Sequence, residues 1–166
     1  MANYNFNKKV LVLTGASGGI GKATMKYFFN CGASLAVTYN RNEEVTALAM
    51  ELDPTQGRIL TEQVDVTSSE ECNNFAQQCL ERYGHADFLV NNAGVLRISA
   101  VEVTSNEFWR QVIATNLDSV FYMCRAFIPI LRQGGAIVNI GSAAAHRGAI
   151  DHSAFAASKA AVLTFS

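Results

Sequence analysis

The sequence has few charged residues and no excess of either sign. Charged side chains make up 16% of the 166 residues, and 13 lysines and arginines stand against 14 aspartates and glutamates, so the formal net charge is −1. Proteins that bind a phosphate backbone carry clustered positive charge. The composition therefore argues against nucleic acid as a partner.

Long apolar runs are also missing. No run reaches the roughly 18 to 20 residues that span a bilayer, and the first ten residues, MANYNFNKKV, contain no apolar stretch typical of a secretory signal. We therefore expect no membrane partner and a cytoplasmic location. The chain contains only 2 prolines, and no Pro-, Gly- or Ser-rich linker divides it. With 49% hydrophobic residues, it can bury the core of one domain spanning residues 1–166.

The 4 cysteines form no CxxC pair, and none lies near a histidine at metal-ligand spacing. Cys72 and Cys79 are seven positions apart in a segment with helical periodicity, so they share a helix face and cannot bridge within it. We expect reduced, partly buried thiols and no metal site. A disulfide or a zinc site is the alternative.

Five apolar runs alternate with segments of helical periodicity. We expect strands over 9–13, 34–38, 59–64, 87–90 and 136–140, and helices over 21–30, 43–52, 68–83, 105–131 and 153–166. Strands that are apolar on both faces and alternate with helices call for a parallel sheet covered on both sides. The pattern predicts a doubly wound, Rossmann-like α/β fold, whose ligands bind beyond the carboxyl ends of the strands.

A glycine-rich turn, TGASGGIG over residues 14–21, joins the first expected strand to the first expected helix. Glycine permits positive φ and lets backbone N–H groups at a helix N-terminus approach a phosphate closely. A lone turn of this kind also occurs for structural reasons alone. Its strand–turn–helix context favours a nucleotide site.

This turn resembles the TGxxxGxG pattern of the classical short-chain dehydrogenase/reductase family, in particular that of the 3-oxoacyl-carrier-protein reductases. Four further motifs follow in that family's order: DVT at 65–67, NNAG at 91–94, Asn116 in the long helix, and Ser142 after the fifth strand. The resemblance covers nearly the whole chain. It implies hydride transfer between a nicotinamide cofactor and a carbonyl or secondary alcohol.

The resemblance also implies which residues surround the dinucleotide: Gly15, Ser17, Gly19, Ile20, Gly21, Asp65, Val66, Asn92, Ala93, Gly94 and Lys159. The end of the second strand sets the choice of cofactor, because a carboxylate there binds the ribose 2′-OH and excludes a 2′-phosphate. That end has no acid here, and Arg41 can pair with phosphate. We therefore favour NADP(H) over NAD(H), with an exposed loop arginine as the alternative reading of Arg41.

Three of the family's four catalytic positions match this sequence. The resemblance implies that Ser142 bonds the substrate oxygen, that Lys159 holds the nicotinamide ribose, and that Asn116 supports a proton relay. The fourth position, a tyrosine four residues before the lysine, is Phe155. Phenylalanine keeps the ring but removes the hydroxyl that gives or takes the proton, so activity of this chain is in doubt.

Nearby residues are poor substitutes for that hydroxyl. Neither His152 nor Ser153 has the i, i+4 spacing that places a side chain beside Lys159. His146 follows Ser142 in a predicted loop, where it either lines a substrate pocket or is simply solvated, and His85 is expected to be an ordinary turn residue.

Members of this family continue into further strands after the lysine helix, whereas the sequence stops at Ser166. We therefore expect five strands, no final strands, and a domain incomplete at its C-terminus, with the fifth strand as an apolar edge. The long helix, with Trp109, Phe121 and Phe127, and the lysine helix are apolar enough to pack against a second copy. Three hypotheses stand: an oxidoreductase acting on a small-molecule or acyl-thioester carbonyl, a catalytically silent dinucleotide-binding or regulatory protein, and an inactive fragment.

Overall fold

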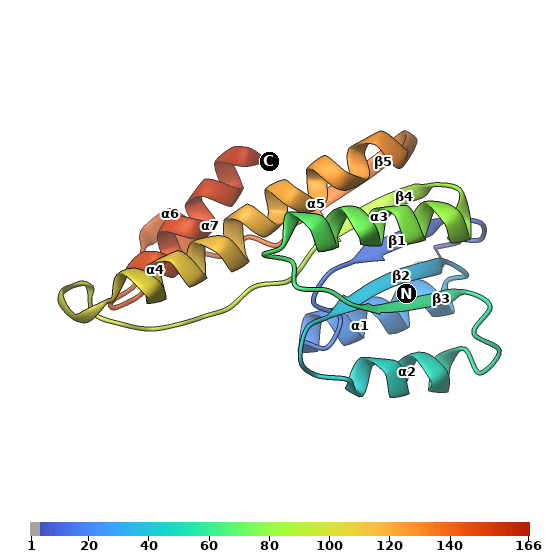
Figure 1. Cartoon of the computed structure of the whole chain (residues 1–166), viewed down its shortest axis with the longest axis horizontal. Coiled ribbons are helices and arrows are strands. Elements are labelled where there is room, and N and C mark those ends of the chain that lie inside the picture. Colours follow the sequence, from blue (N-terminus) through green and yellow to red (C-terminus); the bar gives the residue numbers. More distant parts are fainter. Residues whose placement is uncertain (1–3) are drawn as a thin grey trace.

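The computed structural model describes residues 4–166 and shows a parallel sheet with helices on both faces (Figure 1). Its five strands lie in the order β3-β2-β1-β4-β5, and every neighbouring pair is parallel. The strands are β1 (Val10–Leu13), β2 (Ser34–Tyr39), β3 (Ile59–Gln63), β4 (Ala86–Asn91) and β5 (Leu131–Asn139). This arrangement confirms the predicted doubly wound α/β class.

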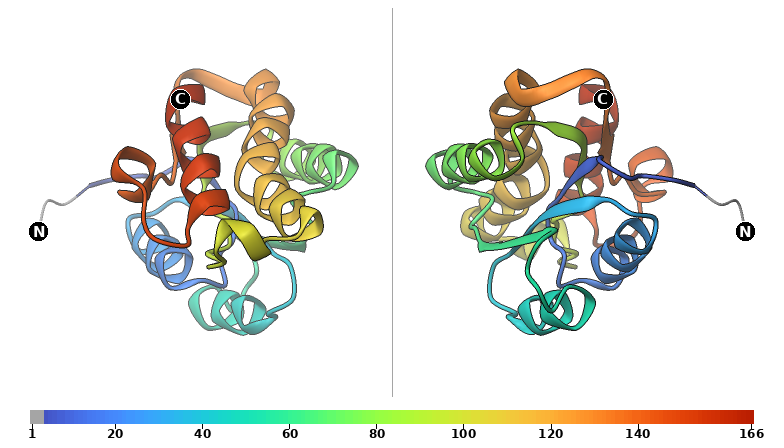
Figure 2. Two further views of the ribbon diagram at one scale, coloured as in Figure 1. Left: turned by 90° about the vertical axis from the view of Figure 1, so that its left-hand side faces the viewer. Right: turned by 90° about the vertical axis from the view of Figure 1, so that its right-hand side faces the viewer.

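The helices lie in two layers, with α1 and α2 on one face of the sheet and α3, α5 and α7 on the other (Figures 1 and 2). Their bounds are α1 (Gly19–Asn30), α2 (Glu44–Leu52), α3 (Ser69–Tyr83), α4 (Asn106–Ile113), α5 (Ser119–Phe127), α6 (Ala144–Arg147) and α7 (Ser153–Phe165). A π-helical segment, η2 (Ala114–Asp118), joins α4 to α5, and the 3-10 turns are η1 (Val101–Val103) and η3 (Ile128–Ile130).

The strands are apolar throughout because each of their faces covers a separate core. Along β1, Leu11 and Leu13 belong to the core beneath α1 and α2, whereas Val10 and Val12 belong to the core beneath α3 and α5. All four are 3% exposed or less. Burying one such side chain stabilises a fold by about 1.5–3 kcal/mol, so this alternation holds both helix layers on the sheet.

The expected boundaries agree with the structure to within two residues except between 127 and 136, where the prediction was wrong. The long helix does not run to residue 131: α5 ends at Phe127, and Pro129 lies in the 3-10 turn that follows. Proline supplies no N–H for a continued helix. β5 then begins at Leu131, five residues before its predicted start, through a bulge in which Leu131 pairs with Ala86 and Ala136 pairs with Phe88.

Two further expectations need correction. His146 is not in a loop, because Ala144–Arg147 forms the short helix α6, and Ser142 Oγ accepts a hydrogen bond from Ala144 N–H at the start of this helix. Phe127 is completely buried, 5.6 Å from the Phe75 ring, and so cannot contribute to an outer apolar face. Trp109 and Phe121 are exposed, as that hypothesis requires.

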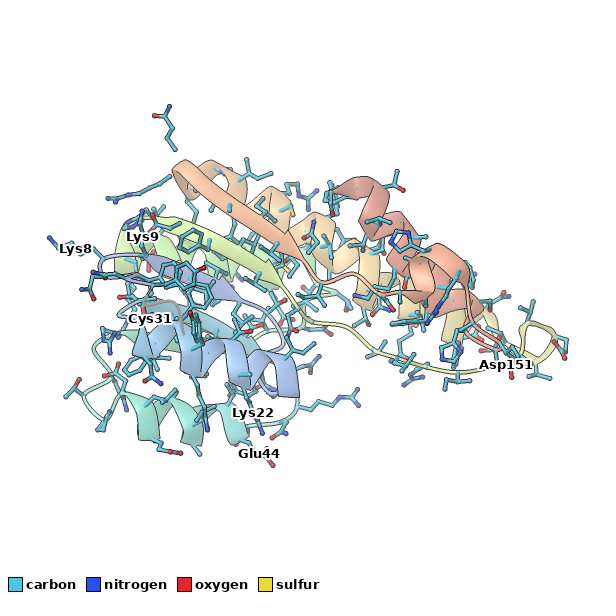
Figure 3. The ribbon with its side chains drawn as sticks, turned by 180° about the vertical axis from the view of Figure 1, so that it is seen from behind. Lys8, Lys9, Lys22, Cys31, Glu44 and Asp151 are labelled. Atoms are coloured by element: carbon cyan, nitrogen blue, oxygen red, sulfur yellow. The ribbon has the colours of Figure 1, made fainter. Side chains whose placement is uncertain are left out.

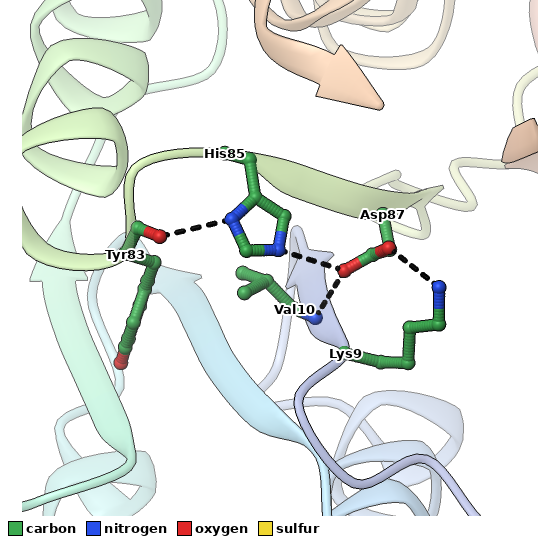
Figure 4. A network of polar contacts seen from close by, with 5 residues as sticks. All are labelled: Lys9, Val10, Tyr83, His85 and Asp87. Carbon is green, nitrogen blue, oxygen red and sulfur yellow. Dashed lines mark hydrogen bonds and ion pairs between the residues drawn. The ribbon is translucent and has the colours of Figure 1, made fainter. Parts of the chain in front are cut away.

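The amino-terminal edge of the sheet carries a closed polar network around Asp87 (Figure 4). Its carboxylate accepts hydrogen bonds from Val10 N–H at 2.8 Å and from Lys9 Nζ at 2.9 Å, and His85 Nε2 lies 3.1 Å away. Burial raises the pKa of Asp87, but the hydrogen bonds from Lys9 and Val10 outweigh burial and leave the pKa below its ordinary value. His85, expected to be an ordinary turn residue, is thus part of a structural network.

Ser166, the last residue, lies at the carboxyl ends of the strands, opposite the Asp87 network. Asn139 at the end of β5 donates a hydrogen bond to Ser166 Oγ at 2.9 Å, which places the end of α7 beside β5 (Figure 2). Val138 on this edge strand is 49% exposed, and the sheet order places β5 at one margin, as predicted. Among residues 4–166, no helix is long and apolar enough to cross a membrane.

Candidate functional site

The glycine turn after β1 packs against the end of β4. Gly15 has φ of +65°, and a Cβ there would lie 2.8 Å from Ala93 Cα. A Cβ at Gly21 would lie 2.7 Å from Ala16 Cα and still closer to the Gly15 carbonyl oxygen. These contacts with backbone leave no room for a side chain. Gly15 and Gly21 are therefore required by the turn itself.

The outer side of the same turn is open. A Cβ built at Gly19 meets no atom within 4 Å, and Gly18, the residue before α1, offers no side chain to cap the first N–H groups. Free N–H groups and the positive end of the helix dipole bind anions. An open cradle of backbone donors at the start of a 12-residue helix fits the pyrophosphate of a dinucleotide.

Thr14 and Asn92 lock the turn to β4. The Thr14 hydroxyl accepts hydrogen bonds from Asn92 N–H and Ala93 N–H, both at 3.0 Å. The Asn92 amide donates to the carbonyl oxygens of Thr14 and Gly15 at 3.0 and 2.9 Å. The motifs around residues 15 and 92, far apart in the sequence, therefore form one rigid unit. Thr14 was not singled out from the sequence.

A cavity of about 560 Å³ opens in front of this unit, at the carboxyl edge of the sheet. Its lining contains nine of the sequence-predicted positions: Gly15, Ser17, Gly19, Ile20, Arg41, Val66, Asn92, Ala93 and Gly94. It also contains residues that the sequence analysis did not assign to the cofactor: Gly18, Asn40, Asn42, Val95, Arg97, Gln111 and Thr115. The lining has two arginines and no carboxylate, so the cavity suits an anionic ligand.

Three predicted cofactor positions lie outside this lining. Gly21 is buried beneath the turn. Asp65 directs one carboxylate oxygen to Thr67, whose N–H and hydroxyl donate to it at 2.9 and 2.7 Å, and this turn presents Val66 to the cavity. Lys159 is buried behind the lining, with its Nζ near Gly94.

Arg41 is exposed and forms no ion pair within residues 4–166. Its loop is held in place on both sides. Gln63 donates to the Asn40 carbonyl oxygen at 2.8 Å, and the Lys22–Glu44 ion pair, at 2.5 Å, ties α1 to α2 (Figure 3). The hydrogen bond from Lys22 lowers the pKa of Glu44. Within residues 4–166, Glu44 is thus paired with Lys22, and no ion pair involves the Arg41 guanidinium.

Asn116 fastens the chain that follows β4. It lies in the π-helical segment η2 and is fully buried. Its Oδ1 accepts from Val95 N–H at 2.8 Å, and its Nδ2 donates to the Val95 carbonyl oxygen at 3.0 Å and to Ser158 Oγ at 3.1 Å. The side chain therefore links η2, the β4–α4 loop and α7.

Lys159 lies beside this link. It is 6% exposed, its Nζ donates to the Ile140 carbonyl oxygen at 2.6 Å, and burial lowers its pKa. A Cβ at Gly94 would lie 3.2 Å from Asn116 Oδ1 and 3.6 Å from Lys159 Nζ. Because Gly94 has no side chain, the end of β4 can lie close to both the Asn116 amide and the Lys159 ammonium.

Phe155 lies one turn before Lys159 on α7 and is half-buried. Its ring is edge-on to the His152 ring at 6.4 Å between centroids, and its carbonyl oxygen accepts from Ser158 Oγ. His152 Nδ1 contacts the Ile150 carbonyl oxygen at 2.5 Å, so one of its ring nitrogens is already engaged. Neither His152 nor Ser142 lines the cavity.

Comparison with known proteins agrees with this geometry. The sequence profile of the short chain dehydrogenase family matches residues 9–166. A 3-oxoacyl-[acyl-carrier-protein] reductase FabG from Chlamydia muridarum is 37% identical over 161 residues, which cover 95% of this chain and 65% of the relative. Other curated relatives are covered to a similar or smaller extent, such as a 3beta-hydroxysteroid dehydrogenase from Mediterraneibacter gnavus at 58%. The chain thus spans less than two thirds of the length of these curated relatives.

Solved structures agree in fold and sequence. A short-chain dehydrogenase/reductase of Brucella melitensis, described as a glucose/ribitol dehydrogenase, superposes with a TM-score of 0.94 at 36% identity, covering 98% of this chain and 68% of its own. A short chain dehydrogenase from Burkholderia cenocepacia, solved in complex with NADP, gives a TM-score of 0.91 at 30% identity, with 97% and 66% covered. Together with the glycine turn, the strand-end motifs and the matched family profile, these likenesses show that the chain belongs to the short-chain dehydrogenase family.

Proposed function

We propose that residues 1–166 form one dinucleotide-binding domain of an NADP(H)-dependent oxidoreductase. Its reaction would interconvert a carbonyl and a secondary alcohol, with Phe155 at the position of the acid/base tyrosine. One observation carries the proposal: the cavity of about 560 Å³ that joins the open glycine turn, the Arg41 loop and the end of β4. The family supplies the class of reaction.

The charges around the cavity support NADP(H) over NAD(H). A dehydrogenase that prefers NAD commonly places a carboxylate at the end of the second strand, where it binds the ribose 2′-OH. Here Asn40, Arg41 and Asn42 line the cavity at that place, and the nearest ion-paired carboxylate, Glu44, is held by Lys22. A free guanidinium can form a charge-assisted pair with a 2′-phosphate.

The nicotinamide group, when bound, supplies the hydride; the chain's own residues position it and control protons. The first N–H groups of α1 would hold the pyrophosphate, and Val66 would flank the adenine. Lys159 lies near Gly94, where its ammonium can bond ribose hydroxyls while keeping its contact with the Ile140 carbonyl oxygen. Ser142 would bond the substrate oxygen, and Asn116 would hold the loop that carries Gly94 and Val95.

Phe155 is the weak point of this chemistry. A positioned acid/base group contributes a factor of about 10² to 10⁴ to rate, equivalent to roughly 3 to 5 kcal/mol of transition-state stabilisation. The benzyl ring cannot exchange a proton, so the chain should bind the cofactor well and turn it over slowly. A tyrosine at this position would place a phenol one helical turn from the Lys159 ammonium, whose charge lowers the pKa of the phenol.

The test is the substitution Phe155→Tyr, assayed as NADPH oxidation with a 3-oxoacyl thioester and with small ketones. We expect a gain of at least about tenfold in kcat/KM. The control is Phe165→Tyr, which adds the same hydroxyl to an exposed ring at the far end of α7 and should leave kcat/KM unchanged. If both variants have the activity of the unmodified chain, the role assigned to position 155 is wrong.

A second function, silent dinucleotide binding, is favoured by a different observation. The Asn116 amide is hydrogen-bonded to Val95 and Ser158, and Lys159 donates to the Ile140 carbonyl oxygen. Both side chains therefore stabilise the fold even when no substrate is bound. A regulatory protein could keep them for that reason alone. Binding of NADPH without turnover, by both the unmodified chain and Phe155→Tyr, would support this alternative.

We also propose that the chain self-associates through its long helix. Trp109 on α4 is 42% exposed and Phe121 on α5 is 44% exposed. Arg125 lies over the Phe121 ring at 4.9 Å. Large aromatic residues and arginine are enriched in protein interfaces. Light scattering of the unmodified chain and of Trp109→Ser would test this, since loss of a dimer in the variant alone is the expected result.

A further inference from the structure

We infer that Arg97 is a second phosphate-binding residue of the crevice and pairs with a phosphate group of the bound dinucleotide. This inference rests on the proposed dinucleotide binding. It concerns a residue of the β4–α4 loop, whereas the glycine turn and Arg41 belong to the β1–α1 and β2–α2 loops. The ligand would then be held by cationic or N–H groups from three separate loops.

The surroundings of Arg97 leave all its donors available. It lines the cavity and is exposed, and within residues 4–166 its guanidinium forms neither an ion pair nor a hydrogen bond. The Phe108 ring lies 5.7 Å from the guanidinium carbon. Such a cation–π contact holds the planar group without using its N–H donors. An arginine presented in this way is suited to a bidentate contact with a phosphate.

The wall beside Arg97 is also polar. Phe108, Gln111 and Thr115 follow one another at spacings of three and four residues, so they share one face of the helix that runs through α4 and η2. Gln111 and Thr115 line the same cavity as Arg97. No aspartate or glutamate contributes to that lining. Nothing on this wall would neutralise the guanidinium, so its charge is available to the ligand.

The loop can carry Arg97 toward a ligand because it is fixed only on either side of it. Val95 is bonded to Asn116 at 2.8 Å, and Ser99 N–H donates to the carbonyl oxygen of Asp151, also at 2.8 Å. Between these points, Leu96, Arg97 and Ile98 are exposed and lie in no helix or strand. A short exposed segment with firm ends allows local movement without disturbing the fold.

The dinucleotide offers two phosphate positions that Arg97 could reach, the pyrophosphate and the adenosine 2′-phosphate. Only one of these two phosphate positions is present in both cofactors. Both NADH and NADPH carry the pyrophosphate, whereas only NADPH carries the 2′-phosphate. Titration with both cofactors therefore identifies the partner of Arg97.

The test is a fluorescence or calorimetric titration of Arg97→Ala with NADPH and NADH, using the 166-residue chain. Loss of a charge-assisted contact should weaken binding at least about tenfold. The matched control is Arg110→Ala, which removes the same charge from an exposed α4 residue outside the cavity, paired only loosely with Glu107 at 4.0 Å. It should change either affinity less than about twofold, because solvent and salt screen distant charges.

Each outcome decides the inference. Weakening of both cofactors in Arg97→Ala supports contact with the pyrophosphate, and weakening of NADPH alone supports contact with the 2′-phosphate. Affinities equal to those of Arg110→Ala overturn the inference while leaving the proposed function intact. If the unmodified chain binds neither cofactor, the proposed function itself fails. Arg97→Lys, which keeps the charge but not the bidentate fork, should lie between the two extremes.

Discussion

The two ends of the parallel sheet use their polar residues differently. At the amino edge, Asp87 is enclosed by Lys9, Val10 and His85, and its carboxylate is 2% exposed. At the carboxyl edge, Arg41 and Arg97 are exposed and free of ion pairs within residues 4–166. A closed network stabilises the fold, whereas unpaired donors around an open cavity are available to a ligand. The difference separates stability from binding in this molecule.

The glycine turn contributes both to stability and to ligand binding, and substitutions at Gly21 and Gly19 should separate the two contributions. Gly21→Ala places a Cβ against the backbone of Gly15 and Ala16. We expect it to cost about 1 to 3 kcal/mol of folding free energy or more, because backbone cannot yield as a flexible side chain can, and to abolish NADPH binding. The measurement is urea unfolding together with cofactor titration.

The control for that substitution is Gly19→Ala, where the new Cβ meets no protein atom within 4 Å. The free energy of unfolding should change little, while NADPH affinity falls because the methyl group occupies the phosphate cradle. If the Gly21→Ala chain is as stable as the unmodified chain and binds NADPH with the same affinity, the close backbone contact inferred at Gly21 is wrong.

Asp87→Asn should damage the amino edge alone. The variant loses the charge that Lys9 pairs with and one of the acceptors, so we expect a loss of about 2 to 3 kcal/mol in stability with unchanged NADPH affinity. Glu107→Gln, which alters an exposed carboxylate, is the matched control and should be neutral. Weaker NADPH binding by Asp87→Asn would mean that the two edges are coupled.

The same carboxylate gives a pH dependence with a defined sign. The pKa of Asp87 is lower in the folded chain than its ordinary value, so its contribution is complete above the unfolded pKa, about 3.9, and is lost as pH falls through the folded pKa. The stability difference between the unmodified chain and Asp87→Asn should therefore shrink as pH falls below about 4, where the Asp87 carboxylate itself is protonated. A difference that grows as pH falls below about 4 would contradict this assignment.

Arg41→Ala should damage the carboxyl edge alone. We expect NADPH affinity to fall about tenfold or more, because a charge-assisted contact to the 2′-phosphate is lost, while NADH affinity and the melting temperature stay unchanged. Equal losses for both cofactors would assign Arg41 to the pyrophosphate instead. Cofactor titrations and a thermal melt check both points.

The smallest effect is expected at the Lys22–Glu44 ion pair. Glu44→Gln removes one negative charge near the Arg41 loop and leaves the Lys22 charge unpaired, so the cavity mouth becomes more positive by one unit. NADPH affinity should rise by about twofold relative to NADH at low salt and lose that gain at high salt. If the variant instead binds NADH better relative to NADPH, the role of Glu44 is to hold the Arg41 loop in position and not to lower the positive charge at the cavity mouth.

Much of the fold could be predicted because its signals are local. Apolar runs marked all five strands, and glycine marked the turn. The stretch from 127 to 136 could not be predicted in this way. There, β5 is set by pairing of Leu131 with Ala86, a contact between residues 45 positions apart in the chain, and apolar residues at 128, 130 and 131 suit a helix as well as a strand.

The site divides in the same manner. Motif residues such as Asn92 and Gly94 could be located from the sequence, and the structure brings them to one cavity. Arg97 could not, because its loop is placed by the bond between Val95 and Asn116, 21 positions away. Likewise, the network around Asp87 could not be predicted: His85 is only two positions away, but the other contacts of Asp87 come from Val10 and Lys9, 77 and 78 positions distant.

The most direct test of the difference between the two edges is titration of the unmodified chain with NADPH and NADH. Saturable binding of one NADPH per chain, tighter than that of NADH, is the result expected from a phosphate cradle with a free Arg41 and no carboxylate in its lining. Absence of saturable binding by either cofactor, in a chain that melts cooperatively, would contradict the assignment of the carboxyl edge as a dinucleotide site.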